Sequence, residues 1–66
     1  MYMVRNDVEI KVHQRKASKT IGISEVALSN ILNRKVACRK VVAYCIAKYI
    51  DTEAEIEDYF EPVKGE

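Results

Sequence analysis

The sequence predicts a mainly α, compact domain of four helices with a short β-strand or hairpin at its N-terminus. From residue 14 onward, apolar residues recur at helical spacing, and Gly22 divides the first such stretch in two. Before residue 14, apolar and polar side chains alternate, which is the period of a β-strand. A chain of 66 residues makes a single domain. Its predicted segments are an N-terminal arm (1–13), two helices with a turn (14–33), a core helix (39–50), a C-terminal helix (52–61) and a tail (62–66).

The N-terminal arm is expected to be extended. Its apolar side chains fall on even positions, namely Tyr2, Val4, Val8, Ile10 and Val12. Arg5-Asn6-Asp7 would form the turn of a small hairpin. The alternative is a helix capped by Asn6 with Glu9 completing a capping box, which would place Val8, Ile10 and Val12 on no single narrow face. A strand with unpaired edges favours pairing with a second copy. We therefore expect a homodimer joined through the chain ends, and a monomer when residues 1–7 are deleted or Ile10 is replaced by proline.

Residues 14–33 are expected to form two helices joined at Gly22. Glycine tolerates the left-handed backbone that ends one helix and aims the next across it. The Ser24 hydroxyl is expected to cap the second helix, with the Glu25 carboxylate at its positive end. Asn33 is expected to supply the left-handed exit from that helix.

Two further helices are predicted after this pair. The core helix carries a broad apolar stripe of Val41, Val42, Cys45, Ile46, Tyr49 and Ile50. Thr52-Glu53-Ala54-Glu55 is typical of a capping box that opens the last helix. That helix would carry Ile56, Tyr59 and Phe60 on one face and stop at Pro62.

Residues Gln14–Asn33 resemble the DNA-binding helix-turn-helix of the lambda-repressor/Cro family, and Gly22-Ile23-Ser24 with the helix after it also resembles the lac-repressor version. The shared features are a glutamine opening the first helix, a small residue in its middle, a glycine turn between apolar residues, and two buried aliphatics in the second helix: Gln14, Ser18, Gly22, Ile21, Ile23, Leu28 and Ile31. The chain departs from the family in having Ser18 where alanine is usual, and in lacking a longer helix before the motif. The resemblance implies a small transcriptional regulator of phage or mobile-element type, a repressor that occupies its operator as a homodimer.

In the geometry of that family, the second helix (24–33) lies in the major groove of double-stranded DNA. The base-reading residues would be Ser24, Glu25, Val26, Ser29 and Asn30. Asn30 can bond adenine, Glu25 can accept from cytosine, and Val26 can touch a thymine methyl group. The phosphate-contacting residues would be Gln14, Lys16, Asn33, Arg34, Lys35, Arg39 and Lys40.

The charge distribution favours a polyanionic partner for this segment. Residues 11–40 hold eight Lys and Arg against one acidic residue, whereas residues 51–66 hold seven Asp and Glu against one cation. A positive field around the two helices attracts phosphate.

Other chemistry is not expected. The acidic residues Glu53, Glu55, Glu57 and Asp58 would point in different directions on a short helix, so we expect no enzyme and no cofactor. Cys38, Cys45 and His13 fall short of the four ligands of a structural zinc site. No apolar run has the length of a membrane span, and we expect a cytoplasmic protein.

Two other functions compete with the DNA-binding regulator. One is a protein-interaction module, an antirepressor or inhibitor that keeps the helix-turn-helix scaffold and binds a protein partner through the acidic C-terminal helix. The other is a ribbon-helix-helix DNA binder reading with strand 8–12, whose first helix would be too short between Val12 and Gly22.

Overall fold

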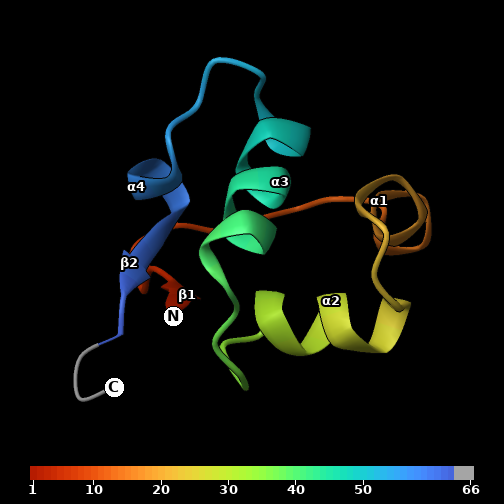
Figure 1. The fold of residues 1–66 in the computed structure, drawn as a ribbon, viewed down its shortest axis with the longest axis horizontal. Helices are drawn as coiled ribbons and strands as arrows, with labels where there is room; N and C mark the ends of the chain where they lie inside the picture. The colour runs from red at the N-terminus through yellow and green to blue at the C-terminus, as the bar shows by residue number, and fades with distance from the viewer. Residues whose placement is uncertain (64–66) are drawn as a thin grey trace.

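The described residues form four helices and a small two-stranded sheet that joins the two ends of the chain. The computed structural model describes residues 1–63. Its elements in order are β1 (Tyr2–Val4), α1 (Gln14–Ile21), α2 (Glu25–Leu32), α3 (Lys40–Ile50), α4 (Ile56–Tyr59) and β2 (Phe60–Pro62). In Figure 1, α3 stands at the centre, α2 crosses below its first turn, α1 lies on one side, and α4 and β2 lie on the other. The described residues are therefore mainly helical, as the sequence predicts.

One hydrophobic core holds these elements together. Every helix and both strands contribute to it, and its buried members are Val4, Ala17, Leu28, Ile31, Cys38, Ala43, Ile46, Ile56 and Phe60. Burial raises the pKa of the Cys38 thiol, which keeps that side chain neutral in the core. Because so short a chain buries a limited area, each element carries a large share of the folding free energy.

The N-terminal strand pairs with the far end of the chain. β1 and β2 are antiparallel, with Tyr2 opposite Pro62 and Val4 opposite Phe60. On the other edge of β1, Tyr2 and Cys38 exchange two backbone hydrogen bonds of 2.7 Å. The predicted hairpin with residues 8–12 is therefore wrong, because β2 supplies the pairing and places Val4 and Phe60, 2% and 1% exposed, together in the core. The free strand edges that suggested pairing with a second copy are occupied within the chain.

Residues 8–13 of the arm are not helical and form no ladder. Val8, Ile10 and Val12 are partly buried and pack against the core, while Glu9 and Lys11 are exposed. The burial of this segment thus follows the predicted period of two without the predicted strand pairing.

The buried face of α3 differs from the predicted stripe. Val41 is 63% exposed, whereas Ala43 and Ala47 are fully buried beside Ile46. Small alanine side chains let a helix approach its neighbours closely, and a pattern weighted toward large apolar residues does not reveal them.

The segment after α3 begins with a turn instead of the predicted helix. The Asp51 carboxylate accepts a 3.0 Å hydrogen bond from the Glu53 N–H, and the Ala54 N–H donates to the Asp51 carbonyl at 2.9 Å. An aspartate that accepts a bond from its own chain two residues on favours such a turn over a helix start. The predicted capping box at Thr52 is therefore wrong.

The last helix is a single short turn. The Asp58 carboxylate accepts from the Glu55 N–H at 2.8 Å just before α4 begins. α4 ends at Tyr59, and Phe60 and Pro62 belong to β2. The prediction that Pro62 stops the last helix is therefore wrong. Residues 64–66 of the predicted tail lie outside the described residues.

Candidate nucleic-acid interface

The turn between α1 and α2 has the predicted local structure. Gly22 has φ 95°, in the left-handed region, and its N–H donates to the Ser18 carbonyl at 2.8 Å. A Cβ atom at Gly22 would meet nothing within 4 Å, so it is the backbone conformation that favours glycine here. Ser18 is the buried polar residue of α1, and its hydroxyl is satisfied because it donates to the Arg15 carbonyl at 2.9 Å.

The first turns of both helices are capped by side chains. The Ser24 hydroxyl accepts a 3.0 Å hydrogen bond from the Ala27 N–H, which confirms the predicted cap of α2. His13 caps α1, because its Nδ1 accepts from the Lys16 N–H at 3.4 Å. The cap at His13 was missed by sequence reasoning, although a side chain with an acceptor directly before the predicted helix start was a usable signal.

Leu28 and Ile31 fix which side of α2 faces outward. Both side chains are buried, Leu28 completely. At 3.6 residues per turn, the opposite side of the helix holds Val26, Ser29 and Asn30, and Glu25 lies on its flank in the first turn. Val26 is 71% exposed, Glu25 and the cap residue Ser24 are exposed, and Ser29 and Asn30 are half-buried. The five predicted base-reading residues thus lie at the start and along the outer face of α2.

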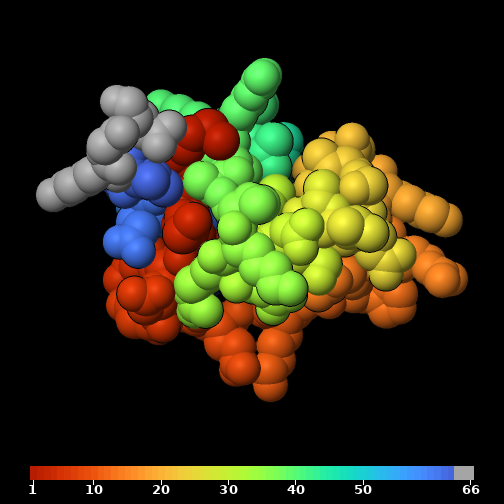
Figure 2. All heavy atoms as spheres, turned by 90° about the horizontal axis from the view of Figure 1, so that it is seen from below, coloured from red at the N-terminus to blue at the C-terminus, as the bar shows by residue number. Residues whose placement is uncertain are grey.

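Figure 2 views this side of the molecule, and α2 with residues 33–38 crosses its middle in yellow to green. α1 borders it on the right in orange, and the N-terminal arm borders it on the left and below in red to orange. The Asn33 amide donates to the Ser29 hydroxyl at 3.3 Å, which ties the end of the helix to its outer face. The outer face of α2 is therefore framed by two other parts of the chain.

Exposed cations lie on the segments that adjoin α2. Lys16 on α1, Lys35 after α2, and Arg39 and Lys40 at the start of α3 are all exposed, and none of them forms an ion pair within residues 1–63. Among the described residues, only one ion pair reaches this face, between Arg15 Nε and Glu25 Oε1 at 4.0 Å. Gln14 is half-buried and lines an open hollow of about 570 Å³ with Arg15 and Glu25. The predicted phosphate-contacting side chains on α1, α3 and the loop are accessible to a polyanion.

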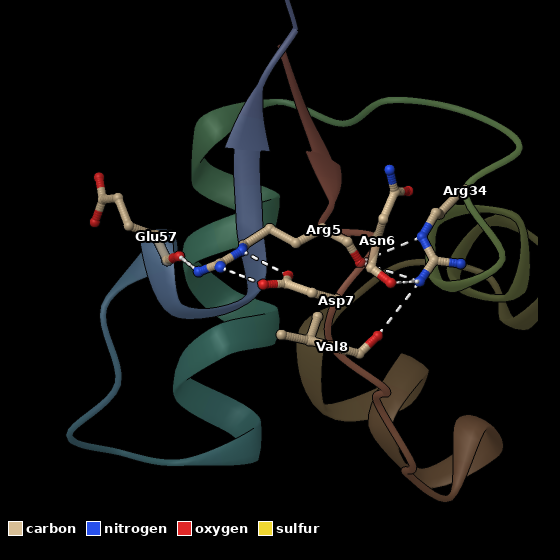
Figure 3. Close-up of polar contacts among 6 residues, drawn as sticks. All are labelled: Arg5, Asn6, Asp7, Val8, Arg34 and Glu57. Atoms are coloured by element: carbon tan, nitrogen blue, oxygen red, sulfur yellow. Dashed lines mark hydrogen bonds and ion pairs between the residues drawn. The ribbon is translucent and has the colours of Figure 1, made fainter.

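Arg34, and not Asn33, supplies the left-handed exit from α2. Asn33 has φ −91°, whereas Arg34 has φ 61°. The Lys35 N–H donates to the Asn30 carbonyl at 2.9 Å and the Arg34 N–H to the Ile31 carbonyl at 3.1 Å, an ending in which glycine usually occupies the left-handed position. The Arg34 guanidinium is directed at backbone carbonyls of the arm (Figure 3).

No family model matches this chain, and no curated protein or solved structure matches it either. Among residues 1–63, no three His, Cys, Asp or Glu side chains are grouped as metal ligands would be. No helix in the same part of the chain is long and apolar enough to cross a membrane. The outer face of α2 and the exposed cations on the adjoining segments are the features that suggest a function.

Proposed function

We propose that this chain is a small sequence-specific DNA-binding regulator that lays α2 in the major groove. The observation that carries the proposal is Val26, which is 71% exposed on the side of α2 that also carries Ser29 and Asn30. A valine in that position makes no contribution to the core, and the methyl group of thymine would give it an apolar partner.

The neighbours of Val26 supply the polar contacts that distinguish bases. The Asn30 amide can donate to and accept from adenine, and the Glu25 carboxylate can accept from cytosine. The 4.0 Å pair between Arg15 and Glu25 is long and exposed on both sides, and such pairs contribute little to stability. Glu25 is therefore available to a base, while Arg15 remains close to the DNA backbone.

The distribution of charge in space supports a polyanion at this face. α4 and β2, which carry acidic residues, lie across the molecule from α1 (Figure 1). Their carboxylates are thus separated from the cations on α1 and leave the positive field around α2 intact. The regulator would act as a homodimer, whose two copies of α2 would read half-sites about 34 Å apart. Its interface must then lie away from the outer face of α2.

Binding to random-sequence duplex at two salt concentrations tests the proposal. Lys35→Gln is expected to weaken binding to all sequences alike and to reduce the slope of log K against log salt by about 0.9, because one fewer phosphate is neutralised. Lys48→Gln is the matched control, since Lys48 lies on α3 near Tyr44 and donates to the Thr52 carbonyl. Binding that does not fall with salt would overturn the proposal.

Asn30→Ala is expected to cost about 1–3 kcal/mol on the preferred DNA site and almost nothing on random sequence. A base contact carries sequence information, whereas a phosphate contact does not. Titration of both duplexes with the variant measures the difference. Equal losses on the two DNAs would remove Asn30 from the base-reading set.

The exposed carboxylates near the C-terminus favour a second candidate function, a protein-interaction module. Within residues 1–63, none of the acidic residues of α4 and its flanks forms an ion pair; they are Glu53, Glu55, Glu57, Asp58 and Glu61. Such a surface suits a basic protein partner. A chain that binds no duplex at low salt would favour this candidate over the DNA-binding regulator.

A further inference from the structure

The Arg34 side chain reaches back to the N-terminal arm (Figure 3). Its Nη2 donates to the backbone carbonyl of Arg5 at 3.0 Å, of Val8 at 3.3 Å and of Asn6 at 3.5 Å. Its Nε donates to the Arg5 carbonyl at 3.3 Å. One guanidinium thus satisfies a bend of the arm that lies 26 to 29 residues earlier in the chain.

The same bend is anchored from its other side by Arg5. Two nitrogens of the Arg5 guanidinium donate to the Asp7 carboxylate at 3.0 and 2.6 Å, and a third donates to the Glu57 carbonyl at 2.9 Å. This pairing lowers the pKa of the Asp7 carboxyl. The bend is therefore fixed to α4 by Arg5 and to the end of α2 by Arg34.

The arm brings Lys11 to the end of α2. Lys11, Asn33 and Arg34 line one open hollow of about 440 Å³ between the arm and α2. The Lys11 ammonium lies 3.7 Å from the Glu9 carboxylate, and both side chains are exposed, so that pair is weak. Lys11 is thus a cation at the edge of the proposed DNA-binding face, held there by the course of the arm.

We propose that Arg34 is a positioning residue that fastens the arm to α2 and thereby places Lys11 against a DNA phosphate. The inference rests on the proposed function and adds the arm to the elements that contact DNA. Arg34 donates to three carbonyls in this way, and a phosphate could take its Nε and Nη2 only by leaving them unsatisfied. A lysine would keep the charge but not the planar fork of donors that this contact uses.

The first test concerns the arm in the free protein. In Arg34→Lys and Arg34→Gln, amide hydrogen exchange of Arg5, whose N–H donates to the Tyr59 carbonyl at 2.9 Å, is expected to be at least about tenfold faster relative to the amides of α3, because the clamp that opposes local opening of the arm is lost. Lys35→Gln is the control, with exchange in the arm unchanged. Wild-type protection of the arm in Arg34→Lys would overturn the proposal.

The second test is a double-mutant cycle on random-sequence duplex. Lys11→Gln is expected to reduce the slope of log K against log salt by about 0.9 in the wild-type protein and by nearly nothing in the Arg34→Lys background. Lys35→Gln should reduce the slope equally in both backgrounds. A general loss of stability in Arg34→Lys would instead change the effects of Lys11→Gln and Lys35→Gln alike. Additive effects of the Lys11 and Arg34 substitutions would show that Lys11 acts independently of Arg34, and the proposal would be wrong.

DNA binding by the chain and the role of the arm in it can be rejected separately. If the wild-type protein binds duplex with a steep salt dependence but Lys11→Gln leaves the slope unchanged in it, the proposed function stands and the role of the arm is rejected. If the wild-type protein binds no duplex, both are rejected, even where exchange in the arm shows that Arg34 holds it.

Discussion

Leu28→Ala is expected to destabilise the domain by about 2–5 kcal/mol, enough to leave much of the protein unfolded at room temperature. Leu28 is fully buried and belongs to the core on the inner side of α2. Removing its side chain loses apolar burial and leaves a cavity among neighbours on other elements. Urea denaturation followed by circular dichroism measures the loss.

Val26→Ala is the matched control for Leu28→Ala, because it removes an aliphatic side chain from the same helix two residues away. At 71% exposure, Val26 should contribute less than about 0.5 kcal/mol to stability. Affinity for a preferred DNA site should fall nonetheless, since the contact with thymine is lost. If the two variants were equally stable, α2 would face the core with a different side, and the proposed reading face would be wrong.

Deleting residues 1–4 is expected to cost about 3 kcal/mol or more and to abolish cooperative folding. The truncation removes β1, the buried side chain of Val4, and the two hydrogen bonds between Tyr2 and Cys38. A buried valine contributes about 1.5–3 kcal/mol and each hydrogen bond about 1 kcal/mol. Thermal unfolding and sedimentation of the truncated chain measure stability and assembly together.

Met3→Ala is the control for this truncation, because it removes a side chain of β1 and keeps the backbone pairing. Met3 is half-buried opposite Glu61 and keeps its strand hydrogen bonds in the variant, so its loss of stability should be small beside that of the truncation. A truncated chain that stays fully folded but loses dimerisation would contradict the internal sheet. It would instead support the prediction from the sequence that the N-terminal strand pairs with a second copy of the chain.

The sequence by itself determined the two helices of residues 14–33 and the turn between them. Gly22 ends α1 because of its own φ angle, and Ser24 caps α2 by a bond to an amide three residues away. Such features depend on neighbours in the chain, so a short stretch of sequence contains their cause. The outer face of α2 was also predictable, because the helical period places Leu28 and Ile31 opposite Val26.

Only the tertiary structure decided the parts that join distant residues. Tyr2 meets Pro62 and Cys38, and Arg34 meets the arm, through contacts across 26 to 60 positions of the chain. The alternation of residues 8–12 was visible, but its cause is burial against the core and not pairing with another strand. Arg34 has the left-handed backbone because α2 continues through Leu32, and the N–H groups of Arg34 and Lys35 donate to the last carbonyls of the helix. A strand edge or a guanidinium can bond any free carbonyl within reach, and which carbonyl is within reach depends on how the whole chain packs.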